Sequence, residues 1–191
     1  VGGDMDGNPN VGATTVRDAL AAQRAQALAC YQSDLRALGD ILTQSEERTG
    51  FDAAISARTE TYKSLLPDGV VRARPRLADM PYRQLLGQMR GRLAATVAGA
   101  AGAYPDAQAF IADLELIDAS LAGHRGDQAG RFALQRVLWR ARTFGFHLAA
   151  LDLRQDSAAH DDALAAWDNR ADWAAQPVPA RVKRLHALIE G

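Results

Sequence analysis

The segment FHLAALDL, residues 146–153, decides how we interpret the fold of this 191-residue chain. It is short and nearly uncharged until Asp152; Gly145 stands before it, and the polar run RQDS (154–157) follows it. Periodicity alone does not separate a buried strand from a continued helix in so short an apolar run. The glycine before the segment and the Ser157 cap after it favour a buried strand.

The rest of the sequence has the spacing of amphipathic helices. Apolar residues recur three and four positions apart, and cap residues or glycine stops bound the runs. We expect helices at about 14–38, 52–65, 80–103, 105–122, 131–144, 157–167 and 179–189. The side chains expected to face the core are Val16, Leu20, Leu28, Tyr31, Leu35, Leu38, Tyr82, Leu85, Leu86, Met89, Leu93, Val97, Phe110, Ile111, Leu114, Ile117 and Leu121.

These patterns predict a mainly α chain with one buried strand and a stub of another before Gly2. One or two strands do not make a stable sheet, so they need partners from outside this sequence. The chain opens directly in the loop VGGD (1–4), has no initiator methionine, and stops at Gly191. We therefore expect a longer natural protein, of which residues 1–191 are a single partial domain.

The composition excludes several classes of function. The net charge of -1 gives no electrostatic footprint for nucleic acid or for an anionic membrane surface. No apolar run approaches the roughly 20 residues that span a bilayer, and no signal peptide is present, which favours the cytoplasm. A single cysteine, Cys30, excludes an internal disulfide framework and a multi-cysteine zinc site.

The loop DMDGNPN (4–10) alternates oxygen-bearing side chains, as a calcium-binding loop does. An EF-hand loop that began at Asp4 would need glycine at its sixth position and glutamate at its twelfth. Pro9 and Thr15 occupy those positions, so the bend and the bidentate ligand are both missing. A polar turn and a ligand-facing loop remain as the other two interpretations.

Arg154 directly follows the expected strand. Ligand groups converge at the C-terminal ends of strands in barrels and open α/β sheets. A guanidinium suits a phosphate or carboxylate there, because its fork of donors matches two oxygens. The alternative is an ion pair with Asp152 or Asp156. The four histidines have no metal-binding spacing, so we expect no metal site among them.

Two stretches of the sequence together resemble the bacterial-type phosphoenolpyruvate carboxylases. GGDMDGNPNV (2–11) is similar to the GGD-x-DGNPNV segment of that family, and FGFHLAALDLRQDSAAH (144–160) to its FG-x-HL…LDIRQ-x-S-x-x-H segment. Between them, PYR (81–83) and MRGRL (89–93) fit the PYR…RxRL helix of the family in the right order. The resemblance spans nearly the whole chain and is weakest at 40–78 and 168–180.

The resemblance implies an active site at the C-terminal ends of the strands of a closed, TIM-like α/β barrel that many helices surround. Such enzymes add bicarbonate to phosphoenolpyruvate, giving oxaloacetate and phosphate for the tricarboxylic acid cycle. They use Mg²⁺ or Mn²⁺, whose ligands lie outside this chain, and form allosteric homo-oligomers, typically homotetramers. The mobile HGRGG loop of the family is also absent from this sequence.

By the same resemblance, Arg154 contacts the substrate phosphoenolpyruvate. Residues 1–13 form a loop at the rim of the site, 14–145 a helical insertion, 146–156 the barrel strand with Arg154, and 157–191 the following helices. The rim residues are Gly3, Asp4, Asp6 and Asn8. No catalytic residue falls within the chain, so we expect it to be inactive alone.

Two further points stay open on the sequence. Arg83, Arg90 and Arg92 would lie near a subunit interface or an activator site, although a solvated helix face explains the same charges. The whole chain could instead be a non-enzymatic helical module for protein interaction that happens to carry these motifs.

Overall fold

The computed structural model of the chain describes residues 10–66, 79–151 and 156–190, and every regular element in these ranges is a helix. The chain divides into two compact units, one formed by residues 20–150 and the other by the residues before and after them. The mainly helical fold class is therefore confirmed.

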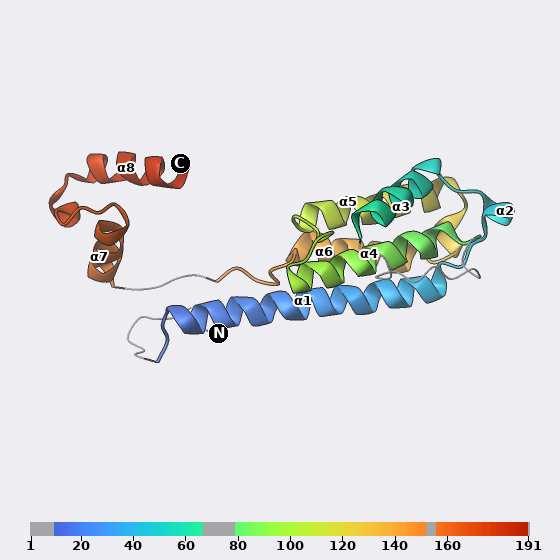
Figure 1. Ribbon diagram of the computed structural model, residues 1–191, viewed down its shortest axis with the longest axis horizontal. Coiled ribbons are helices and arrows are strands. Elements are labelled where there is room, and N and C mark those ends of the chain that lie inside the picture. Colours follow the sequence, from blue (N-terminus) through green and yellow to red (C-terminus); the bar gives the residue numbers. More distant parts are fainter. Residues whose placement is uncertain (1–9, 67–78, 152–155, 191) are drawn as a thin grey trace. The chain divides into compact units, whose positions relative to one another are not determined.

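Figure 1 shows the helices of the larger unit packed as a bundle, with α1 along its length. Their bounds, with those of one 3-10 turn, are α1 (Ala13–Ile41), α2 (Glu46–Thr49), α3 (Ala53–Leu65), α4 (Pro81–Ala98), α5 (Ala107–Gly123), η2 (Gly126–Gln128) and α6 (Arg131–Phe144). The first residues of α1 belong to the smaller unit. The other elements of that unit are α7 (Ser157–Trp167), η3 (Trp173–Ala175) and α8 (Val178–Glu190).

One apolar core holds α1, α3, α4, α5 and α6 together. Each of these helices turns one stripe inward, and the residues at the centre of the core are completely inaccessible to solvent. They include Leu35, Leu42, Ile55, Leu85, Met89, Leu93, Phe110, Leu114, Ile117 and Leu134. Most of the core-facing predictions are confirmed, and Val16 is buried but lies outside the core cluster. Two exceptions, Leu20 and Val97, are 41% and 58% exposed.

Both exceptions have a structural reason. Leu20 lies on α1 before the part that meets the core, since the first α1 residue in the core cluster is Ala27. Val97 lies in the last turn of α4, where its neighbour Thr96 is buried instead. The Thr96 hydroxyl donates to the Arg92 carbonyl at 2.8 Å and accepts from the Tyr104 backbone N–H at 2.9 Å.

Aspartate caps and left-handed glycines set several helix ends. The carboxylates of Asp52 and Asp106 accept hydrogen bonds from the first-turn amides of α3 and α5. Gly99, with a φ of 62°, ends α4 before the predicted residue 103. The predicted cap of α7 was Ser157, but Asp156 supplies it, accepting from the Ala158 amide at 2.8 Å.

The segment 146–156, predicted as a barrel strand, has no strand in its described residues, 146–151 and 156. The chain turns here instead: the Leu148 amide donates to the Phe144 carbonyl, and Ala149 to His147, both at 2.9 Å. A strand needs neighbouring strands for its amides and carbonyls, and the described chain contains none. The backbone therefore satisfies its hydrogen bonds locally.

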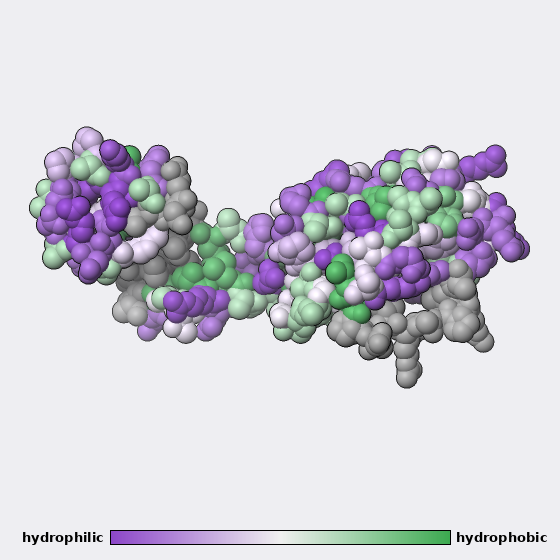
Figure 2. Space-filling model, turned by 45° about the horizontal axis from the view of Figure 1, so that its top comes forward, coloured by the Kyte–Doolittle hydropathy of each residue, from purple (hydrophilic) through white to green (hydrophobic). Residues whose placement is uncertain are grey.

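The surface of the molecule is mixed in character. Figure 2 shows hydrophilic residues over most of the visible face, with apolar residues in small groups between them. Among the described residues, no helix is both long and apolar enough to cross a membrane.

Candidate functional site

The five residues predicted for the substrate site, Gly3, Asp4, Asp6, Asn8 and Arg154, lie outside the residues that the structure describes. The structure does describe the turn that leads toward Arg154. We call residues 145–149 the anchor turn, because α1 and the aromatic core hold it in place.

Phe146 fixes the anchor turn to the core. Its side chain is only 5% exposed and belongs to a cluster of four aromatic rings. The ring centroids of Phe110, Tyr31 and Tyr104 lie 5.8, 6.2 and 6.3 Å from that of Phe146. The guanidinium of Arg24, on α1, covers the same ring at 5.9 Å. Phe146, the first residue of the predicted strand, is thus buried and fixes the turn to the core.

Tyr31 holds the backbone of the turn. Its hydroxyl donates to the Gly145 carbonyl at 2.8 Å, with a longer contact of 3.3 Å to the Arg140 carbonyl. Burial is the main cause that raises the pKa of Tyr31 to about 12. The phenol therefore stays protonated and remains a donor at neutral pH, tying α1 to the end of α6.

Gln23, two turns before Tyr31 on α1, binds the C-terminal part of the anchor turn. With its amide nitrogen facing the turn, it donates to the His147 carbonyl at 3.2 Å and to the Ala149 carbonyl at 3.0 Å. Gln23, Arg24 and Tyr31 thus contact the anchor turn along one face of α1. Sequence reasoning missed these contacts, because the residues lie more than 110 positions from the turn.

Gly145 makes the bend of the turn possible. Its φ of 50° lies in the left-handed region, which favours glycine. A Cβ atom at this position would approach the His147 ring to 2.9 Å. Leu148 also has a positive φ, 68°, a conformation that bulky residues rarely adopt. The anchor turn is therefore a strained connection held by its surroundings.

A second polar cluster lies inside the bundle, around Asp113. This side chain is completely buried, and it accepts hydrogen bonds from the hydroxyls of Tyr62 at 2.7 Å and Tyr104 at 2.6 Å. Arg58 forms an ion pair with the same carboxylate. Burial raises the pKa values of both Tyr62 and Tyr104, which keeps them as donors.

Arg92 completes this cluster without touching the carboxylate. Its guanidinium lies between the rings of Tyr62 and Tyr104, 4.4 and 4.0 Å from their centroids. It also donates to the Gly102 carbonyl at 3.1 Å and the Ala103 carbonyl at 3.0 Å. At 7% exposure Arg92 does not lie on a solvated helix face, so that explanation is wrong for this arginine.

The cluster around Asp113 is a structural element of the bundle. Both carboxylate oxygens of Asp113 and the hydroxyls of Tyr62 and Tyr104 are used within it. Sequence reasoning missed Asp113, although its spacing from Phe110, Leu114 and Ile117 placed it on the buried face of α5. A carboxylate at a core-facing position of a helix is itself an indication of a buried network.

Comparison with known proteins identifies the kind of sequence to which this chain is similar. A family model described as phosphoenolpyruvate carboxylase matches residues 1–190. Over 191 residues the chain is 49% identical to the phosphoenolpyruvate carboxylase of Xanthomonas euvesicatoria pv. vesicatoria and 47% identical to that of Xanthomonas campestris pv. campestris. It is 34% identical, over 212 residues, to the phosphoenolpyruvate carboxylase of Burkholderia mallei.

These alignments cover almost all of the chain but a small share of each relative. The share of this chain is 100% for the Xanthomonas proteins and 99% for the Burkholderia protein. The share of the relatives is 21% and 20%. The chain thus spans about a fifth of the length of the curated relatives that it matches.

Proposed function

The chain belongs to the phosphoenolpyruvate carboxylase family, and from this we propose that it acts as part of a carboxy-lyase that adds bicarbonate to phosphoenolpyruvate. The products are oxaloacetate and phosphate, so the reaction supplies the tricarboxylic acid cycle. The observation that carries the proposal is the family match over residues 1–190, at nearly half identity to named carboxylases. The isolated chain is inactive, because it spans only a fifth of those relatives.

Arg154 binds the substrate in this proposal. The phosphoryl group of phosphoenolpyruvate moves to bicarbonate, which gives carboxyphosphate and the enolate of pyruvate. Carboxyphosphate then releases phosphate and carbon dioxide, and the enolate carbon attacks the carbon dioxide to form oxaloacetate. Negative charge lies on the substrate oxygens throughout, and a guanidinium fork offsets it with two directed hydrogen bonds. The rim loop, with Gly3, Asp4, Asp6 and Asn8, orients the basic groups of the site.

In the whole protein, residues 146–156 lie in a TIM-like barrel. Residues 1–13 form the rim loop, 14–145 the helical insertion, and 157–191 the helices that follow. A strand needs neighbouring strands for its backbone amides and carbonyls, and the described residues of this chain contain none. Neighbouring strands from the rest of the carboxylase supply those partners.

The metal ion of the family has no fitting site among the residues that the structure describes. The part of the chain that the structure describes has no group of three or more His, Cys, Asp or Glu side chains able to hold a metal ion. His124, for example, lies with Nδ1 2.7 Å from the Ser120 carbonyl oxygen. We infer from the family resemblance that the ligands of the Mg²⁺ or Mn²⁺ ion lie in parts of the carboxylase outside this chain. We also propose that the whole carboxylase is cytoplasmic and allosteric, and that it is a homo-oligomer, a homotetramer. It has no nucleic-acid or membrane partner in this proposal.

Substitution of Arg154 by lysine in the whole carboxylase tests the proposal. A point charge replaces the bidentate fork, so we expect kcat/KM for phosphoenolpyruvate to fall by about ten- to a hundredfold, the equivalent of one charge-assisted hydrogen bond or more. The matched control is Arg36→Lys, an exposed arginine of α1, which should leave kcat/KM unchanged. A value for Arg154→Lys equal to that of the unsubstituted enzyme would remove Arg154 from the substrate site.

A further inference from the structure

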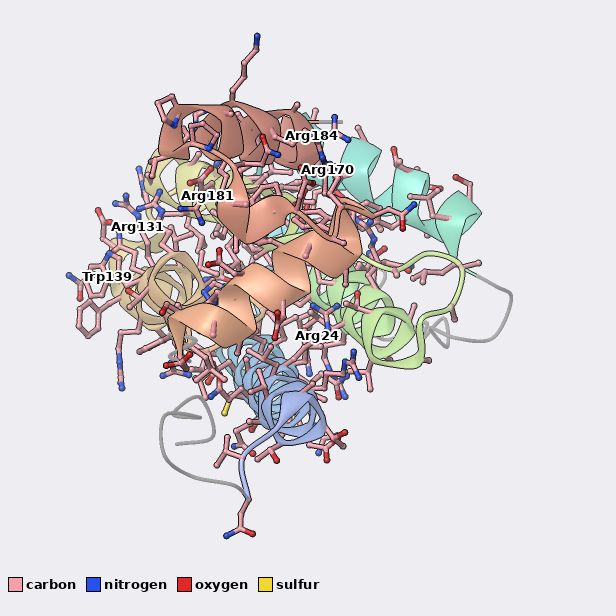
Figure 3. All side chains as sticks on the ribbon, turned by 90° about the vertical axis from the view of Figure 1, so that its left-hand side faces the viewer. Arg24, Arg131, Trp139, Arg170, Arg181 and Arg184 are labelled. Carbon is pink, nitrogen blue, oxygen red and sulfur yellow. The ribbon has the colours of Figure 1, made fainter. Side chains whose placement is uncertain are left out.

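Helix α6 carries aromatic residues on the side that faces away from the core. Its buried side chains are Leu134, Val137, Leu138 and Ala141. Phe132, Arg136 and Trp139 are spaced four and three residues apart, which places them together on the opposite side of the helix. We call these three residues the α6 outer stripe. Figure 3 shows Trp139 pointing outward from the bundle.

The two aromatic residues of the stripe are exposed and lie against each other. Phe132 is 62% exposed and Trp139 51%. Their ring centroids are 6.0 Å apart in an edge-to-face arrangement. The outward side of a surface helix is normally polar, so a pair of aromatic rings there contributes nothing to the core of the bundle.

The charge of Arg136 adds a second feature. The neighbouring arginines of α6 are paired: Arg131 with Asp118 and Asp127, Arg140 with Asp34, and Arg142 with Glu115. Arg136 is exposed and makes no hydrogen bond or ion pair with any other described residue. Aromatic residues and arginine are the side chains most enriched where protein surfaces bind tightly. The stripe therefore has the composition of an interface.

We propose that the α6 outer stripe docks a segment of the carboxylase polypeptide that lies outside this chain. This inference rests on the proposed function, and its main support is length: the relatives are about five times as long as the chain. The docked segment brings an apolar side chain to the ring pair and a carboxylate to Arg136. A second copy of the same stripe fits poorly, because Arg136 lies near its middle and a twofold pairing would bring two guanidiniums together.

The first test measures solvent access to Trp139 by hydroxyl-radical oxidation and mass spectrometry. It compares the 191-residue chain with a whole carboxylase, made as the Xanthomonas euvesicatoria relative with this chain in place of its matching fifth. We expect Trp139 to be oxidised several-fold more slowly in the whole protein. Phe110, which is fully buried in the bundle, is the internal reference and should be slow in both.

Three outcomes of this test would overturn the proposal. Equal oxidation of Trp139 in both proteins means that nothing outside the chain covers it. Slow oxidation already in the 191-residue chain means that the chain covers the stripe itself. Protection that is lost when the whole enzyme dissociates into subunits means that another subunit is the occupant.

The second test uses the double variant Phe132→Gln/Trp139→Gln. We expect its melting temperature to match the unsubstituted value in the 191-residue chain and to fall by several degrees in the whole carboxylase. Val97→Gln, at an equally exposed but isolated apolar residue, should change neither. Arg136→Glu should lower the melting temperature of the whole protein, and Arg136→Lys should lower it less. Equal shifts in both proteins would assign the stripe to the bundle itself.

Neither test uses catalysis as its readout. Carboxylation of phosphoenolpyruvate by the unsubstituted whole protein is measured separately. A protein that lacks this activity but protects Trp139 would contradict the proposed function and leave the docking surface in place.

Discussion

At the scale of single residues, Asp113 holds the buried polar cluster of the bundle together. It is completely buried, and one carboxylate serves Tyr62, Tyr104 and Arg58. Asp113→Asn keeps the shape but removes the charge and turns one acceptor into a donor that faces other donors. We expect the free energy of unfolding to fall by about 3 kcal/mol, as for a broken buried ion pair. Urea denaturation followed by circular dichroism measures it.

Glu115→Gln, two residues along the same helix, is the matched control. Glu115 also pairs with an arginine, Arg142 at 2.7 Å, but both side chains are about half exposed. An exposed pair of this kind contributes about 0.5 kcal/mol or less. If the two variants lose the same stability, the buried network is not what stabilises this region.

At the scale of elements, two glycines should respond in opposite ways to replacement by alanine: Gly145 in the anchor turn and Gly39 in α1. Gly145→Ala puts a residue with a Cβ at a left-handed backbone position, and that Cβ would lie within 2.9 Å of the His147 ring. We therefore expect the free energy of unfolding to fall by about 1–3 kcal/mol. Gly39→Ala adds a methyl group inside α1 with nothing within 4 Å, so we expect a gain of about 0.5–1 kcal/mol. Thermal and urea unfolding of the two variants should shift in opposite directions. Shifts of the same sign would contradict the backbone conformation described for Gly145.

The helices could be predicted from sequence because their determinants are local. Stripes such as Leu28 to Leu38, together with cap residues such as Asp106, are readable within a few turns of chain. The end of α4 was missed by several residues, because apolar and alanine residues continue the helical pattern past Gly99. The predicted strand at 146–156 is not found in its described residues, because a strand depends on partners far away in the sequence or outside the chain, and no local pattern reports whether those partners are present.

The candidate site could be predicted only as far as motifs reach. Arg154 and the rim residues came from the resemblance, and they lie outside the described ranges. The contacts of Gln23 and Tyr31 with the anchor turn depend on how α1 packs against the end of α6. Such long-range pairing needs the folded chain.

At the scale of the whole molecule, all four tyrosines are buried and have raised pKa values, with burial as the first cause. A raised pKa means that the folded protein favours the protonated phenols. The resulting stability is fully present below the ordinary value of 10.0 and is lost as pH rises through the folded values, about 12 for Tyr31. We therefore expect the free energy of unfolding to decrease steeply from pH 10 upward.

Urea denaturation between pH 8 and pH 12, roughly the range that brackets a free phenol, checks this expectation. Phenolate absorbance in the folded protein should lag behind that of the unfolded chain and appear together with the loss of helical circular dichroism. Tyr31→Phe removes one titrating phenol, so the free energy of unfolding of this variant should fall less steeply with pH. Tyrosines that titrate near pH 10 with intact helices would contradict the burial described for them.

Arg92 is enclosed by two phenol rings and two carbonyls, and this limits which substitutions the bundle can accept in the course of evolution. A cation that is neutralised by ring faces and backbone dipoles leaves the single carboxylate of Asp113 free for Arg58 and the phenols. Removal of Asp113 alone would take the shared acceptor from Arg58, Tyr62 and Tyr104. Anyone who transplants the bundle into a new protein must carry Arg58, Tyr62, Arg92, Tyr104 and Asp113 as an inseparable set.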